Sequence, residues 1–85
     1  MATFDVETRR RYAREGIAMP DGSFPIPNEE SLGDAIHAVG RARPNTAEHR
    51  AAVRRHILKR ARALGAMSMI PSSWNRDGSL SDGND

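Results

Sequence analysis

The segment from Ile17 to Pro27 restricts the fold of this chain more than any other, because no helix can run through it. It holds three prolines in eight residues, at positions 20, 25 and 27. The run Pro20-Asp21-Gly22 predicts a turn, since proline presets one backbone dihedral and glycine accepts a positive φ. Apolar side chains stand between and beside the prolines: Met19, Phe24 and Ile26. We expect an extended segment laid across the core. A short hairpin at the turn is the alternative, which the later prolines disfavour.

Two helices are expected around this segment. The first covers about Asp5 to Glu15, where Asp5 can cap the first turn and Gly16 supplies a left-handed stop. Its few apolar residues predict that it leans on the body through Tyr12. The second begins after Pro27, with Asn28 as its cap. Helical spacing gives it one buried stripe: Leu32, Ala35, Ile36 and Val39.

A third helix is predicted from about Ala47 to Leu64, ending at Gly65. Pro44 separates it from the second helix, and either Asn45 or Thr46 can cap it. One apolar stripe runs along its length: Val53, Ile57, Ala61 and Leu64.

The chain after Gly65 carries the run Ile70-Pro71-Ser72-Ser73-Trp74, which we expect to fold back as a clasp that closes the core. With 85 residues and no cysteine, the chain has too little apolar surface for two cores. We therefore predict a mainly all-α fold, a compact three-helix domain over residues 1–74. Residues 75–85 are polar and acidic and predict a flexible tail.

Positive charge gathers in one segment. Residues 41–62 contain eight cations and only one carboxylate, Glu48, although the whole chain has a net charge of +2. At about 100° per residue, Arg55, Lys59 and Arg62 share the face of the third helix opposite its apolar stripe. Arg54 and Arg60 flank the stripe. A solvated face that keeps the protein soluble is the ordinary explanation of such residues, but the lack of intervening acids favours a binding surface.

Closely spaced phosphates attract such a surface, so DNA or another polyanion is the partner that the charge indicates. An acidic protein is the alternative. The arginines at positions 9, 10, 11 and 14 extend the basic region, with Glu7 and Glu15 offsetting them. The predicted binding residues are Arg41, Arg43, Arg50, Arg54, Arg55, Lys59, Arg60 and Arg62.

No residue pattern in the sequence supports catalysis, a cofactor or a metal site. The serines fall at turns or near the end of the sequence, and no glycine-rich phosphate loop is present. His49 and His56 stand seven residues apart, which is not a spacing that zinc sites on helices use. We expect His56 to be a boundary packing residue. No apolar run reaches the roughly 20 residues of a membrane span, and Met1 to Tyr12 contain no secretory signal or membrane anchor.

Several segments together resemble a small domain of unknown function found in tailed bacteriophages and actinobacterial prophages. The resemblance covers about residues 9 to 80 and is carried by four runs: residues 12–26, from Tyr12 to Ile26; residues 35–42, Ala35-Ile36-His37-Ala38-Val39-Gly40-Arg41-Ala42; residues 56–65, from His56 to Gly65; and residues 70–74, the Ile-Pro-Ser-Ser-Trp run. Members occur alone or attached to phage head or protease proteins, and the family offers no catalytic residues to transfer. It implies a phage-associated binding or structural role.

The basic helix and the resemblance together predict a phage-encoded, non-enzymatic accessory binding protein whose basic helix engages nucleic acid, in the packaged head or elsewhere. Two rivals use the same surface. One is a capsid or head-assembly component that binds an acidic protein, and the other is a host-takeover factor that inhibits one bacterial protein. The expected location is the bacterial host cytoplasm or the virion.

Overall fold

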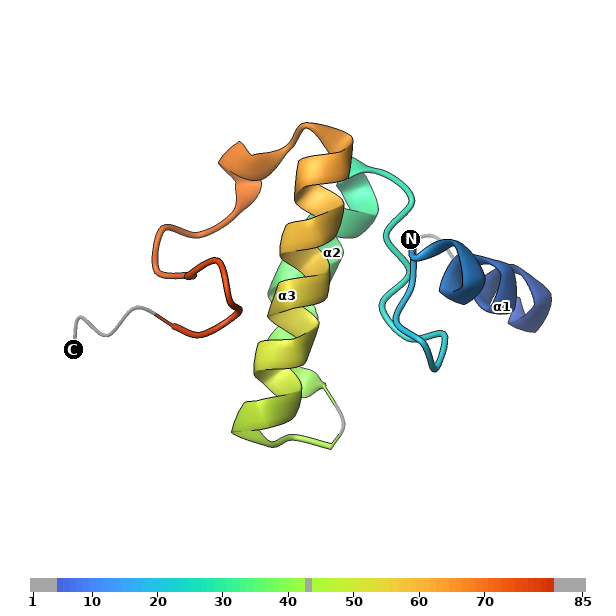
Figure 1. Cartoon of the computed structure of the whole chain (residues 1–85), viewed down its shortest axis with the longest axis horizontal. Coiled ribbons are helices and arrows are strands. Elements are labelled where there is room, and N and C mark those ends of the chain that lie inside the picture. The colour runs from blue at the N-terminus through green and yellow to red at the C-terminus, as the bar shows by residue number, and fades with distance from the viewer. Residues whose placement is uncertain (1–4, 43, 81–85) are drawn as a thin grey trace.

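The described part of the protein consists of three α-helices and two short 3₁₀ helices, joined by irregular segments (Figure 1). The computed structural model describes residues 5–42 and 44–80. Its elements, in order, are α1 (Val6–Glu15), α2 (Glu29–Ala38), η1 (Val39–Arg41), α3 (Ala47–Leu64) and η2 (Met67–Met69). The mainly helical fold with three helices is as predicted. None of the described helices is both long and apolar enough to span a bilayer.

Each α-helix begins at a side-chain cap. The cap oxygens accept bonds from backbone N–H groups three residues ahead: Asp5 from Thr8 at 2.7 Å, Asn28 from Ser31 at 2.9 Å and Thr46 from His49 at 3.1 Å. Thr46, rather than Asn45, is therefore the cap of α3. Such a cap stabilises a helix by about 1 kcal/mol. Gly16 and Gly65 end α1 and α3 with φ of 80° and 69°, in the left-handed region that glycine tolerates.

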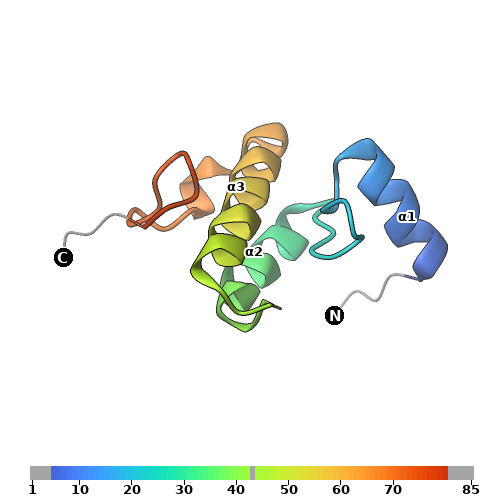
Figure 2. The same cartoon turned by 60° about the horizontal axis from the view of Figure 1, so that its bottom comes forward.

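The core lies between α2 and α3, which run side by side in both views (Figures 1 and 2). Its largest fully buried side chains are Ile26, Leu32, Val53 and Ile57. Ile26 comes from the proline-rich segment, so that segment supplies part of the core as predicted. Burial of one such side chain contributes about 1.5–3 kcal/mol. Partly buried side chains pack around this core: Met19, Phe24, Ile36, Leu64, Ile70 and Trp74.

The proline-rich segment forms a narrow loop. Ile26 N donates to Ile17 O at 3.0 Å, and Met19 N donates to Ser23 O at 2.9 Å. Gly22 takes a φ of 85° at its tip. Two such bonds close the loop, but the ladder extends no further because Pro25 and Pro27 lack the N–H groups that it would need.

Helix α1 stands apart from the α2–α3 pair in both views (Figures 1 and 2). None of its residues is buried, and Tyr12 and Ala13 are half-buried. The Tyr12 carbonyl accepts bonds from Ile17 N and Ala18 N, at 2.8 and 3.0 Å. The helix is therefore held at its C-terminal end, which leaves most of its arginine side chains exposed.

Residues 75–80 differ from the flexible tail that we expected. Trp74 and Leu80 form an antiparallel bridge, and Asn75 N donates to Ser79 O at 2.9 Å. Gly78, with a φ of 89°, is buried against α3. We call residues 75–80 the C-terminal turn. It docks through backbone atoms and a glycine rather than through apolar side chains, so its hydropathy gives no sign of order. Residues 81–85 of the expected tail lie outside the described residues.

Candidate nucleic-acid interface

The outer face of α3 carries three exposed cations, Arg55, Lys59 and Arg62, as the helical periodicity predicted. We call these three residues the α3 strip. They stand four and three residues apart, so they follow one another along the helix surface. Figure 1 shows α3 between the C-terminal segment on one side and α1 with its loop on the other. The α3 strip therefore lies between two flanking segments.

Arg54 corrects the predicted site. We expected its side chain to meet a partner, but only 8% of it is exposed. Its Nε donates to the Gly78 carbonyl of the C-terminal turn. Loss of hydration on burial lowers the pKa of Arg54, and repulsion from Arg50 lowers it further. Arg54 therefore fixes the C-terminal turn to α3, and it is not a surface contact.

Other arginines of α3 also reach backbone or amide oxygens. Arg60 Nε donates to Ile26 O at 2.9 Å, which ties α3 to the proline-rich loop. Arg55 Nη1 donates to Asp77 O at 3.1 Å, and Arg50 donates to the Asn45 side chain. These acceptors carry no net charge, so the bonds orient the guanidinium groups and leave their positive charge in place.

The remaining two predicted site residues are not on α3. Arg41 is exposed at the end of η1, beside α2 in the chain. Arg43 lies outside the described residues. The described part of the predicted site therefore divides into the exposed α3 strip, the tethers Arg54 and Arg60, and the peripheral Arg41 and Arg50.

Asp77, on the C-terminal turn, is a carboxylate whose pKa is affected by Ser79 and by Arg55 of the α3 strip. Its pKa is lowered chiefly by hydrogen bonds from the Ser79 side chain and backbone, and the charge of Arg55 lowers it further. The Ser79 hydroxyl and N–H lie 2.6 and 2.9 Å from Asp77 Oδ1. The Asp77 carboxylate is therefore held within its own turn, and Arg55 contacts the Asp77 carbonyl instead.

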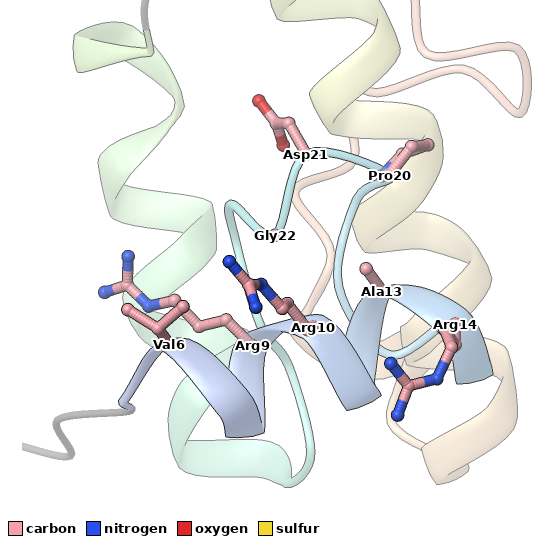
Figure 3. A pocket seen from close by; sticks show the side chains of 8 residues that line it. All are labelled: Val6, Arg9, Arg10, Ala13, Arg14, Pro20, Asp21 and Gly22. Atoms are coloured by element: carbon pink, nitrogen blue, oxygen red, sulfur yellow. The ribbon is translucent and has the colours of Figure 1, made fainter.

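Two adjoining hollows lie along α1, and one of them also borders α3. One, of about 330 Å³, lies beside the α3 strip and is lined by Ala13, Gly16, Ala18, Met19, Pro20, Ala52, Arg55, His56 and Lys59. The other, of about 570 Å³, lies between α1 and the turn at Pro20–Gly22 (Figure 3). It is lined by Val6, Arg9, Arg10, Ala13, Arg14, Pro20, Asp21 and Gly22. Both hollows share Ala13 and Pro20, so they adjoin.

The second hollow brings arginines of α1 toward the site. Arg9, Arg10 and Arg14 line it, whereas the Arg11 guanidinium lies over the Tyr12 ring, 5.5 Å from its centre. The sequence indicated that these arginines extend the basic region, but it offered no means of separating Arg11 from the other three. Which of these arginines line the hollow depends on where the Pro20–Gly22 turn lies.

His56 is a packing residue, as predicted. It is 8% exposed, and its Nε2 lies 3.0 Å from the Phe24 carbonyl oxygen. Burial lowers its pKa, although hydrogen bonding to the Phe24 carbonyl acts in the opposite direction. The imidazole therefore links α3 to the proline-rich loop. Within residues 5–42 and 44–80, no group of three metal-ligating side chains gathers at one place.

Comparison of the chain with protein-family models, with curated proteins and with solved structures found no match. The resemblance to a phage domain stays a prediction. Function must therefore be argued from the surface itself.

Proposed function

We propose that this protein binds nucleic acid through the phosphate backbone, with the α3 strip as its main contact surface. The observation that carries the proposal is the exposure of Arg55, Lys59 and Arg62 along one face. The hydrogen bonds of Arg55 and of the neighbouring Arg54 and Arg60 end on uncharged oxygens. Three like charges at this spacing repel one another and weaken an isolated helix. A polyanion relieves that repulsion.

Counterion release supplies the driving force. Each phosphate that a lysine or arginine neutralises releases condensed cations, and affinity then falls steeply with added salt. Arginine and lysine in this role position the protein on the backbone and need no base contacts. The tethers at Arg54 and Arg60 fix the segments beside the α3 strip, so binding does not have to order the backbone there.

A binding role rather than catalysis suits the hydroxyl groups near the site. Ser23 Oγ lies 2.6 Å from Asp21 Oδ1, and Ser79 Oγ lies 2.6 Å from Asp77 Oδ1. Each pair closes its own turn, two residues apart in sequence. A nucleophilic serine needs a base that is itself oriented by a third group, and these two pairs serve turn geometry instead.

The proposal is tested by fluorescence anisotropy with a labelled DNA duplex at low salt. Replacing Arg55, Lys59 and Arg62 by alanine should weaken binding by at least about tenfold, since three cations no longer neutralise phosphates. A matched variant that replaces Arg55 and Arg62 by lysine keeps the charge and should bind within about threefold of wild type. Arg76, exposed on the C-terminal turn, supplies a control, and Arg76→Ala should have little effect. Equal binding by the alanine variant and wild type contradicts the proposal.

We further propose a phage or prophage setting, which the resemblance of residues 9–80 suggests. Mass spectrometry of purified virions is the test. A protein that is present in virions but does not bind DNA fits the rival role in head assembly. Toxicity on expression, with one stoichiometric host partner, fits the host-takeover role.

A further inference from the structure

The arrangement of basic side chains indicates whether the bound nucleic acid is a single strand or a duplex. Arg9, Arg10 and Arg14 of α1 line a hollow that adjoins the one lined by Arg55 and Lys59 of α3. The cations therefore form two rows on two separate elements. One is the α3 strip, and we call the other, Arg9, Arg10 and Arg14, the α1 row. A single strand presents one line of phosphates, whereas a duplex presents two lines that flank a groove.

One carboxylate, Asp21, lines the hollow with the α1 arginines. Its pKa is lowered by the Ser23 hydroxyl and backbone N–H, from which it accepts bonds at 2.6 and 3.0 Å. Figure 3 shows its carboxylate pointing away from the α1 arginines. The charge of Asp21 is thus engaged in its own turn, and the α1 row keeps its positive character.

The lining lacks a platform on which bases can stack. None of the described residues around either hollow is phenylalanine, tyrosine or tryptophan. Tyr12 of α1 has the Arg11 guanidinium over its ring, and Trp74 belongs to the C-terminal segment. Proteins that hold single strands combine a basic groove with exposed aromatic rings. The surface therefore suits a paired nucleic acid better than a single strand.

The segments packed beside α3 also disfavour base readout by this helix. A helix with its side chains is about 10–12 Å wide and just fits the major groove of about 12 Å. Gly78 packs on one side of α3, where an added Cβ would lie 2.3 Å from Ala51 O and 2.7 Å from Arg55 Cγ. The proline-rich loop packs on the other side, through His56 and Arg60. With these segments attached, the surface around α3 is wider than a lone helix, which favours contact with phosphates over insertion into the groove.

We infer that this protein binds the phosphate backbones of duplex nucleic acid without base readout, with the α1 row and the α3 strip as two lines of contact. This inference rests on the proposed function and specifies its partner. Phosphate contacts alone do not distinguish base sequences, so affinity should depend on salt and hardly on sequence.

The test compares four labelled probes at one salt concentration: two 20-bp DNA duplexes of unrelated sequence, a 20-nucleotide single strand and a 20-bp RNA duplex. The two DNA duplexes should bind within about twofold of each other, and the single strand at least about fivefold more weakly. The affinities for the DNA and RNA duplexes show which of the two kinds of duplex the protein prefers. Equal or tighter binding of the single strand, or more than about tenfold preference for one DNA sequence, overturns the inference.

The α1 row is tested separately. Replacing Arg9, Arg10 and Arg14 by alanine should reduce the slope of log affinity against log salt by about 0.9 for each phosphate that the variant no longer neutralises. Arg11→Ala removes a charge from the same helix outside the hollow and should leave the slope within about 0.3 of wild type. An unchanged slope in the triple variant removes α1 from the interface while leaving the proposed function standing. Failure of every probe to bind refutes the proposed function itself.

Discussion

Gly78 lies so close to Ala51 that a Cβ atom at position 78 would stand 2.3 Å from the Ala51 carbonyl oxygen. Its φ of 89° adds a second reason for glycine, because other residues rarely adopt that backbone. The contact joins the C-terminal turn to the helix that bears the α3 strip. It is flanked by bonds from Arg54 and Arg55 to Gly78 O and Asp77 O.

Gly78→Ala should therefore detach the C-terminal turn and lower the free energy of unfolding by about 1–3 kcal/mol, through the steric clash and the strained φ. Thermal unfolding measures the destabilisation, and amide hydrogen exchange at residues 75–80 should rise. Gly40→Ala is the matched control, because no atom lies within 4 Å of a Cβ built there. Equal stability of Gly78→Ala and wild type would contradict the docking of the turn.

Arg54 and Arg62 should respond oppositely to replacement by alanine. Arg54→Ala removes a buried, charged hydrogen bond to Gly78 O, so stability should fall by about 1.5–3 kcal/mol. Arg62 is exposed, and Arg62→Ala should change stability by less than about 0.5 kcal/mol while weakening DNA binding. Urea denaturation and anisotropy measure the two effects. An Arg54→Ala variant that is as stable as wild type but binds DNA more weakly would show that Arg54 contacts the nucleic acid.

Amphipathic periodicity predicted most of the fold and misplaced Arg54 for a physical reason. The pattern gives the angle of a side chain from the apolar stripe, but burial also depends on what packs from outside the helix. Arg54 and Leu58, four residues apart, are both buried, although neither belongs to the predicted stripe. The C-terminal turn packs beside Arg54 through Gly78. By contrast, none of the described segments buries the α3 strip, so its exposure was predictable from the angle alone.

Local signals predicted the helix ends for a different reason. Capping depends only on residues within one turn, so Asp5, Asn28 and Gly65 could be assigned without tertiary information. The two hollows beside α1 are the opposite case. They depend on where the Pro20–Gly22 turn lies, and nothing in the neighbouring sequence determines that.

Acid should destabilise the protein through His56. Burial lowers its pKa, so the folded state binds fewer protons than the unfolded state below about pH 6.5. Its contribution is complete above that value and declines as the pH falls, by at most about 1.4 kcal/mol per unit. Urea denaturation between pH 7.5 and about 4.5 measures the decline, since the acids with lowered pKa values, Asp5, Asp21 and Asp77, titrate below about 3.8.

Two controls separate His56 from other groups. His56→Gln should flatten the pH dependence, whereas His37→Gln, at an exposed position, should preserve it. Titration of the His56 ring by NMR provides a second readout that needs no variant. A ring that protonates above pH 6.5 would show that burial does not govern its pKa.

The N-terminal end of α3 offers a test of local structure. Thr46→Ala removes the oxygen that accepts from His49 N and should lower stability by about 1 kcal/mol. Asn45→Ala, which removes only the side-chain bond with Arg50, should have a smaller effect. Thermal unfolding of both variants decides the order. A larger destabilisation by Asn45→Ala would contradict the assignment of the cap.

The salt dependence of duplex binding reports how many phosphates the α3 strip neutralises. Wild type and a variant with Arg55, Lys59 and Arg62 replaced by alanine are titrated with one DNA duplex at several salt concentrations. The slope of log affinity against log salt should be lower in the variant by about two to three, near 0.9 for each phosphate left without its cation. Identical slopes for the two proteins would contradict the proposed function, because the α3 strip would then make no phosphate contact.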